Sequence, residues 1–488
     1  MTDPHPASAE SAYLSCDNIA ELFADGRLTS VQLVRTLLER IEAIDTVGTE
    51  VGLNAIAQVA EDAVRVAQEC DDERVQGVSR GPLHGIPVLV KDNVEVEGLS
   101  GLAGSTALIG RPTRDAPLVG RLRAAGAIVL ASTNLSQWAN IRSPRSTSGY
   151  SSTAGLVGNP WALDRSAGGS SSGSGAALAA GLAPLAVGTE TDGSITCPAS
   201  VNGVVGLKPT VGTVPTQYVV PISASQDSPG PMARSVSDVA LLYGVLAQSE
   251  PPAEVLDVTF AVATNYRTDH PQTDKLFDTI VEALRASDEK VVDREVALPG
   301  ESEGHDELAV MLAELVDAMT VYLLDRPGEG VRSLADVVAY EDEHADVEQV
   351  YFGHELFTMA VETGGRTGEA YAGARARNLT WAVETCLTPA LEGVDVLLAP
   401  AYGPAWKSDL AVGGHPGPAS PATMAPAIAG WPIMCVPIGL IQDLPIGLAI
   451  IGRPQSEWTL IEAARRIEAL VARNSPMPLP LWKPATRG

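Results

Sequence analysis

The sequence predicts an α/β fold, a single large domain with a central mixed β-sheet covered by helices. Three observations carry this prediction. Helical patterns and short apolar strands succeed one another in the first half of the chain, short buried strands return after residue 390, and no segment is a convincing linker. Although 488 residues often form two or three domains, single α/β domains also reach this length. We therefore assign residues 1–488 to one domain, with its core over about residues 17–472.

The N-terminal elements are expected to be helices followed by buried strands. Residues 17–44 predict two helices separated by an Asp-Gly turn, and Thr29 and Ser30 offer a cap for the second. A third helix is expected over residues 54–70. The next elements are, in order, an apolar strand over residues 86–90 that ends at Lys91, a helix in GRLRAAG, and a buried strand over residues 127–131.

A run of serine and glycine between Ser143 and Gly175 has the composition of a flexible linker. It leads directly into an Ala-rich helix and an apolar strand, however, and a linker would not normally be joined so closely to core elements. We therefore expect this run to be packed. The remaining elements are a strand over 258–262, a helix over 273–286, an edge strand, an acidic helical stretch over 301–390, three short buried strands, and a helix that reaches Leu470.

The composition is that of an ordinary globular protein, with 45% hydrophobic and 19% charged residues. The 33 basic and 60 acidic side chains give a net charge of −27, which argues against nucleic acid as a partner. The N-terminal residues lack a signal-peptide pattern and no apolar run is long enough for a membrane span, so we expect a cytoplasmic protein without a membrane partner. We expect the protein to be a monomer or a homodimer.

The sequence contains no motif that predicts a metal ion or a cofactor. The five cysteines are odd in number and scattered, and the seven histidines have no metal-ligand spacing, so no metal and no cofactor is expected. HExxH, Walker A and GxGxxG motifs are also missing from the sequence. Residues 169–173 match the GxSxG pattern with Ser171 at its centre, but a polar loop precedes them where an α/β-hydrolase esterase would have a strand.

One lysine and two serine turns remain as candidates for chemistry. Lysines at strand ends are usually solvated, but burial of Lys91 would lower its pKa and leave an amine able to act as a base. A serine hydroxyl needs such a base. The turns 168–171 and 191–194 each hold serine beside glycine, and the backbone N–H groups of the second could converge on one anionic oxygen. This combination makes acyl transfer plausible; tight backbone alone would also explain both turns.

At these residues the sequence resembles the amidase signature family. Three blocks occur in the family's order: GPLHGIPVLVKDN, GGSSSGSGAALAAG and GTETDGSITCPASVNGVVGLKPT. They place Lys91, Ser170 and Ser194 at the matching positions, separated by 79 and 24 residues. The resemblance covers most of residues 17–472, and its motifs are closest to those of bacterial peptide amidases. The stretch 301–390 is the least matched and is expected around the substrate entrance.

The resemblance implies a Ser-cisSer-Lys triad and hydrolysis through an acyl-enzyme. Ser194 would be the nucleophile, Ser170 the bridging serine after a cis Gly169-Ser170 peptide bond, and Lys91 the neutral terminal base. The oxyanion hole would comprise the backbone N–H groups of Thr191, Asp192, Gly193 and Ser194, with Ser171 supporting the network.

Two departures from the family concern the substrate pocket. Thr196 stands where many members carry arginine, and Asp192 replaces a glycine. Trp138 and Tyr150 are candidates for the pocket lining, although core packing explains them equally well.

The resemblance favours an amidohydrolase acting on linear uncharged amides, among them C-terminal peptide amides, aryl or alkyl amides and, by extension, carbamates (urethanes). The substrate partner would therefore be a small-molecule or peptide amide. An alternative is the A subunit of a glutamyl-tRNA amidotransferase, an ammonia donor within a complex. Such proteins usually show GTDTGGSIR where this chain has TETDGSIT. A binding protein whose loops hold an anion is a third interpretation.

Overall fold

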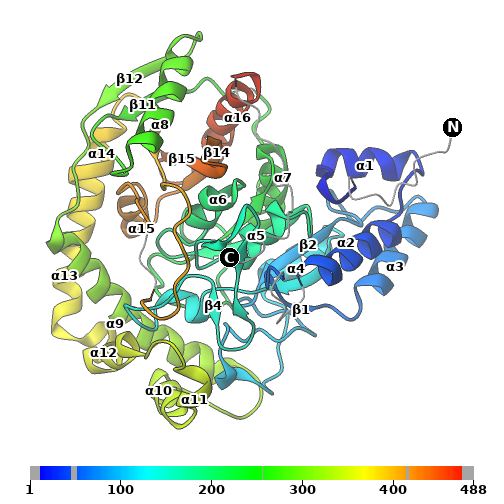
Figure 1. The fold of residues 1–488 in the computed structure, drawn as a ribbon, viewed down its shortest axis with the longest axis horizontal. Coiled ribbons are helices and arrows are strands. Elements are labelled where there is room, and N and C mark those ends of the chain that lie inside the picture. The colour runs from blue at the N-terminus through cyan, green and yellow to red at the C-terminus, as the bar shows by residue number, and fades with distance from the viewer. Residues whose placement is uncertain (1–10, 46–51, 255, 414–416, 475–488) are drawn as a thin grey trace.

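An 11-stranded mixed sheet runs through the part of the chain that the computed structural model describes, which is residues 11–45, 52–254, 256–413 and 417–474 (Figure 1). The strand order is β1-β3-β2-β8-β10-β9-β14-β15-β13-β11-β12. Parallel pairs join β2 to β3 and β8, and β11 to β12 and β13, whereas the pairs in the centre are antiparallel. The predicted fold class, a mixed sheet covered by helices, is confirmed.

The strands of this sheet are short and most are buried on both faces. Apolar residues therefore run through them almost without interruption, as in LLAP and IMCV. The bounds are β1 Ile56–Val59, β2 Pro87–Lys91, β3 Ile128–Thr133, β8 Leu185–Glu190, β9 Val205–Lys208, β10 Ser228–Ala233, β11 Thr259–Ala263, β12 Lys290–Arg294, β13 Val396–Pro400, β14 Ile433–Ile441 and β15 Leu444–Gly452.

Helices pack along the sheet and at its ends (Figure 1). Their bounds are α1 Cys16–Ala24, α2 Ser30–Ile44, α3 Ala63–Val75, α4 Pro117–Ala124, α5 Ser172–Ala179, α6 Thr196–Asn202, α7 Val236–Ala247, α8 Pro271–Arg285, α15 Met424–Ala429 and α16 Glu457–Asn474, with short 3₁₀ turns at Ser11–Tyr13, Thr106–Leu108 and Gln137–Asn140. The predicted cap is present, because the Thr29 hydroxyl accepts from the Gln32 N–H at 3.1 Å. Among the described helices, none combines the length and the apolar character that a membrane crossing requires.

The expectation of one helix over residues 54–70 is wrong. Its first part is strand β1, which pairs antiparallel with β3, and α3 begins only at Ala63. The Asp45 carboxylate accepts from the N–H groups of Ala55 and Ile56 at 2.7 and 2.8 Å, which holds this segment extended at the sheet edge. Pairing with a strand far away in the sequence has therefore overridden the helical preference of an Ala-containing segment.

The Ser/Gly-rich run is packed, as predicted. It forms four short strands (β4 Tyr150–Ser151, β5 Gly155–Leu156, β6 Gly158–Asn159 and β7 Ala162–Ser166) and then helix α5, every residue of which is buried. Gly173 of α5 lies so close to its neighbours that a Cβ there would be 2.3 Å from the Ala55 carbonyl oxygen. The small side chains therefore let α5 lie directly against backbone.

The acidic stretch over 301–390 is helical, as predicted, and forms a lobe at one side of the molecule (Figure 1). Its apolar residues make a second hydrophobic cluster with residues from the 103–108, 138–141 and 220–222 segments. The helices are α9 Glu301–Asp325, α10 Leu334–Glu343, α11 Ala345–Glu348, α12 Glu355–Thr363, α13 Glu369–Leu379 and α14 Thr388–Ala390, with a 3₁₀ turn at Gly365–Thr367 and a π-helical stretch at Thr380–Leu387.

Candidate active site

Lys91 ends strand β2 with its side chain completely buried. Its Nζ lies 2.7 Å from Ser170 Oγ, 2.9 Å from Thr189 Oγ1 and 3.3 Å from the Thr189 carbonyl oxygen. Burial disfavours the charged form and lowers the pKa of Lys91 to about 7, although negative charge on Asp227 and Glu190 opposes this shift. A neutral amine is therefore accessible near neutral pH.

Ser170 follows an unusual peptide bond and is anchored through its carbonyl group. The Gly169-Ser170 bond is cis, in agreement with the expectation from the sequence. The Ser170 carbonyl oxygen accepts a hydrogen bond from the Ser136 N–H at 3.1 Å. The next residue, Ser171, supports the same region, since its hydroxyl donates to the Thr189 carbonyl at 3.1 Å and accepts from the Thr189 N–H at 3.2 Å.

Ser194 lies in the turn between β8 and α6, beside the two serines. Its carbonyl oxygen accepts from the Ser171 N–H at 3.1 Å. The Glu190 carboxylate at the end of β8 accepts from the N–H groups of Ile195 and Thr196 at 2.7 and 2.8 Å, which fixes the start of α6. The structure therefore joins Lys91 to Ser170 by a direct hydrogen bond, and it places Ser194 next to them through a backbone hydrogen bond to the adjacent Ser171.

Glycine is required at the centre of this turn. Gly193 has a φ of +78°, and a Cβ there would lie 2.5 Å from the Tyr402 hydroxyl oxygen. Within the described ranges, the N–H groups of Asp192, Gly193 and Ser194 donate to no protein acceptor. These three groups therefore remain available to an anionic oxygen; that they form an oxyanion hole together with the Thr191 N–H stays a prediction.

Several partners of this site were missed by the sequence reasoning. Thr189 and Glu190 stand inside the GTETDGS block, so their position beside the predicted turn was a usable signal. Asp227 had no such signal, because it lies 36 residues after Thr191 in the sequence. Its Oδ1 accepts a hydrogen bond from the Thr191 hydroxyl at 2.6 Å. Burial raises the pKa of Asp227 to about 6.

A cavity of about 440 Å³ opens beside these residues. Thr189, which contacts Lys91, contributes to its lining together with Thr191 and Asn93, whereas Lys91, Ser170 and Ser194 are not among the lining residues. Residues 211–229 form one wall, and α9 contributes another between Glu314 and Asp325. Part of the 301–390 stretch therefore borders this cavity, while its position around a substrate entrance stays a prediction.

The three predicted pocket residues are not part of this lining. Trp138 is 2% exposed, and its ring packs edge-on against Phe357 at 5.8 Å between centroids. Tyr150 likewise packs against aromatic side chains, and Thr196 is fully buried at the start of α6. Core packing therefore describes both rings: Phe357 of α12 packs against Trp138, and Tyr351 and Phe352, between α11 and α12, pack against Tyr150.

Side chains that could bind a metal ion do not gather in the part of the chain that the structure describes. Among the residues that the structure describes, no three His, Cys, Asp or Glu side chains come together in a group that could hold a metal ion. The chemistry that the geometry of the site suggests is proton transfer between a buried amine and a serine hydroxyl.

The comparisons with known proteins agree with this geometry. The family model named Amidase matches residues 32–461. The chain belongs to the amidase family. As an amidase, it is 37% identical to the native peptide amidase of Stenotrophomonas maltophilia, with a TM-score of 0.89 over 98% of this chain and 100% of that one.

Curated relatives of this amidase carry two kinds of name. A protein of Arabidopsis thaliana named "Probable amidase" is 34% identical over 94% of this chain and 90% of the relative. The A subunit of the glutamyl-tRNA(Gln) amidotransferase of Streptomyces avermitilis is 32% identical over 96% of this chain and 97% of the relative.

Burial of two lysines should be visible by NMR. Only six lysines occur in the sequence, so ¹³C signals of their ε-carbons can be assigned by substitution. We expect one signal to titrate near pH 7 and to be missing from the Lys91→Met variant. A second should titrate near pH 8 and be missing from Lys208→Met, because Lys208 is also fully buried. A Lys91 signal that stays protonated above pH 9 would contradict the neutral amine.

Proposed function

We propose that this amidase hydrolyses linear, uncharged amides through an acyl-enzyme, using Ser194 as nucleophile, Ser170 as bridging serine and Lys91 as terminal base. The observation that carries the proposal is the 2.7 Å contact between the buried Lys91 amine and the Ser170 hydroxyl, beside a cavity large enough for a substrate. A buried amine whose pKa is about 7 has the basicity that general base catalysis requires near neutral pH.

The three partners of Lys91 Nζ fit its neutral form. A neutral amine has two N–H donors and one lone pair. The two donors can serve the carbonyl and hydroxyl oxygens of Thr189, while the lone pair accepts from the Ser170 O–H. Ser170 can then pass its proton to Lys91 and take up the proton of Ser194. The resulting ammonium keeps all three partners as acceptors, so proton transfer leaves no group unpaired.

Bond cleavage follows from the same relay. As Ser194 attacks the amide carbonyl, negative charge develops on the carbonyl oxygen, and the N–H groups of residues 191–194 stabilise it. Each such donor contributes roughly 2.7–4 kcal/mol in comparable sites. The relay returns the proton to the leaving nitrogen, which departs as ammonia or an amine. Water then attacks the acyl-enzyme by the same route and releases the carboxylic acid.

The cavity supports linear amides as substrates. Much of its lining is aliphatic, including Val211, Val220, Ile222 and Val321. Its one lining arginine, Arg366, already pairs with Asp317 at 3.0 Å, so an acidic substrate finds no free cation among the described lining residues. Peptide amides fit best, because their leaving group is ammonia and needs little space. The cavity is then free to hold the acyl part of the substrate. Aryl and alkyl amides and, more slowly, carbamates share the planar carbonyl that the mechanism needs.

A second candidate function is that of the ammonia-donating A subunit of a glutamyl-tRNA amidotransferase. Relatives of that name at 32% identity favour it. The TETDGSIT sequence at the Ser194 turn argues against it, as does the absence of a free cation for the carboxylate of glutamine among the described lining residues.

Substitution of the serines tests the assigned roles. Ser194→Ala should lower kcat by about ten-thousand-fold or more and abolish labelling by a serine-directed phosphonate. Ser170→Ala should lose about a hundred- to ten-thousand-fold yet still be labelled, because the nucleophile remains. Both variants should keep the wild-type melting temperature within a few degrees. Full activity of Ser194→Ala, or an undiminished rate in Ser170→Ala, would refute the corresponding role.

A substrate panel tests the proposed function itself. We expect kcat/KM to be highest for a C-terminally amidated dipeptide with a blocked N-terminus, with stoichiometric ammonia release, followed by an anilide and then a carbamate. Free glutamine should be poor, because burying its unpaired charges costs several kcal/mol. If glutamine were preferred by a wide margin, the ammonia-donor function would replace ours. Turnover of the anilide and carbamate alone would refute peptide amides as substrates.

A further inference from the structure

A left-handed turn of three consecutive non-glycine residues lies next to the site. Trp138, Ala139 and Asn140 have φ values of +50°, +52° and +76°. L-residues rarely adopt this conformation, so three in a row persist only where surrounding contacts hold them. The sequence WAN contains no glycine that would relieve the strain.

The turn lines the cavity and is connected to Ser170 through the preceding residue Ser136. Ser136, two residues before it, donates its N–H to the Ser170 carbonyl at 3.1 Å and accepts from the Gly149 N–H through its hydroxyl at 2.8 Å. Ala139 contributes to the lining of the 440 Å³ cavity. The position of the turn therefore bears on the bridging serine and on the cavity wall together.

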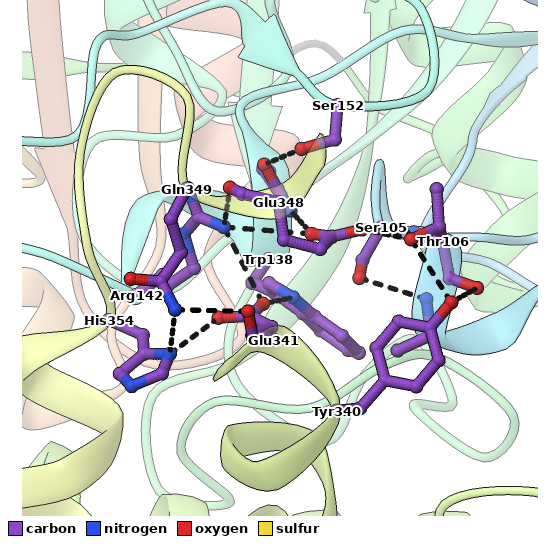
Figure 2. A network of polar contacts seen from close by, with 12 residues as sticks. Ser105, Thr106, Trp138, Arg142, Ser152, Tyr340, Glu341, Glu348, Gln349 and His354 are labelled. Carbon is purple, nitrogen blue, oxygen red and sulfur yellow. Dashed lines mark hydrogen bonds and ion pairs between the residues drawn. The ribbon is translucent and has the colours of Figure 1, made fainter. Parts of the chain in front are cut away.

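Two buried carboxylates from the helical lobe hold the turn (Figure 2). Glu341 of α10 accepts from the Trp138 indole N–H at 2.9 Å. Glu348 of α11 accepts from the Gln137 side-chain amide, and its other oxygen accepts from the Thr106 N–H at 2.6 Å. Both glutamates are 0% exposed, so no water substitutes for these contacts.

A buried arginine and a partly buried histidine lie beside these carboxylates. Arg142 is also fully buried and lies 3.6 Å from a carboxylate oxygen of each glutamate, while its guanidinium donates to the Glu348 carbonyl at 2.6 Å. His354 Nδ1 lies 3.1 Å from the second oxygen of Glu341. Figure 2 shows the network converging on the turn from the lobe side. A buried polar group that loses its hydrogen-bond partner costs free energy, so this network favours a single arrangement of the lobe and the turn.

We propose that Glu341 and Glu348 are positioning residues for amide hydrolysis: through Trp138 and Gln137 they hold the left-handed turn, and so set the cavity wall at Ala139 and the anchor of Ser170. The helical lobe thereby fixes which substrates fit. This inference rests on the proposed function, because it takes the triad and the cavity as the site of amide hydrolysis. A purely structural role would affect folding stability without affecting substrate discrimination.

Glu348→Gln is the sharpest variant. It replaces one carboxylate oxygen by an NH₂ group, which then faces either the NH₂ of Gln137 or the backbone N–H of Thr106. Gln137 can accommodate it only by reversing its amide, which requires the Ser152 hydroxyl, now a donor to Gln137 at 2.9 Å, to become an acceptor. In either orientation the negative charge beside Arg142 is lost. Trp138→Phe is the milder companion, since it removes the N–H to Glu341 and keeps an aromatic ring against Phe357. Asp238→Asn is the matched control, a buried carboxylate of α7 that accepts from the Cys16 N–H.

The kinetic test compares an amidated dipeptide, a large substrate, with propionamide, a much smaller one. In Glu348→Gln we expect kcat to fall about tenfold for both, and KM to rise about fivefold or more for the dipeptide amide alone, since small displacements in a site cost large factors in rate. Trp138→Phe should give the same pattern with smaller factors. Asp238→Asn should leave kcat and the ratio of the two KM values unchanged. Loss of stability in Glu348→Gln with unchanged kinetics would overturn the proposal.

Two further measurements separate the turn from general stability. Glycine at position 139 adopts a positive φ without strain, so the turn should then depend less on Glu348. The double variant Ala139→Gly/Glu348→Gln should therefore differ little from Ala139→Gly alone in the ratio of the two KM values. Amide hydrogen exchange over residues 136–142 should accelerate about tenfold or more in Glu348→Gln and stay unchanged in Asp238→Asn. Unaltered exchange, or a double variant whose KM ratio still differs widely from that of Ala139→Gly alone, would refute the positioning role. The exchange experiment needs no turnover, so it remains decisive even if the panel of amides is not hydrolysed.

Discussion

Burial of the Lys91 amine is the constraint on which the rest of the site depends. Once removed from water, the amine has only the partners that the protein supplies, and these are the Ser170 hydroxyl and two oxygens of Thr189. They satisfy the neutral and the charged form equally, so the proton can move without leaving a buried group unpaired. Negative charge on Asp227 and Glu190 limits the fall in pKa and keeps the base strong enough to be useful.

The fold supplies this environment by close backbone packing. Strands β2 and β8 are parallel neighbours, which puts Lys91 and Thr189 at the same edge of the sheet. Helix α5 can approach that edge because its first turns consist of serine and glycine. The helical lobe completes the enclosure, with α9 as a wall of the cavity and Glu341 and Glu348 bonded to the segment that precedes the serine loop.

Sequence reasoning recovered the fold class and most elements, because hydrophobic periodicity marks helices and buried strands that pack by their own pattern. It failed at β1, where pairing with β3 decides the structure and local preference does not. For the site, Lys91 and the serine turns were visible as residues, but their association across 79 positions came from family resemblance. Asp227 and the contact of Trp138 with Glu341 had no local signal, since each joins segments far apart in the chain.

The most direct measurement of the central claim is the pH dependence of kcat/KM for a linear amide in wild type and in Asp227→Asn. In the wild type, kcat/KM should rise with pH through an apparent pKa of about 7, as Lys91 loses its proton. In Asp227→Asn the negative charge that favours the Lys91 ammonium is missing. The pKa of Lys91 should therefore fall, and the rise in kcat/KM should move to lower pH. A rise that stays in place in Asp227→Asn, or that persists in Lys91→Ala, would contradict Lys91 as the base.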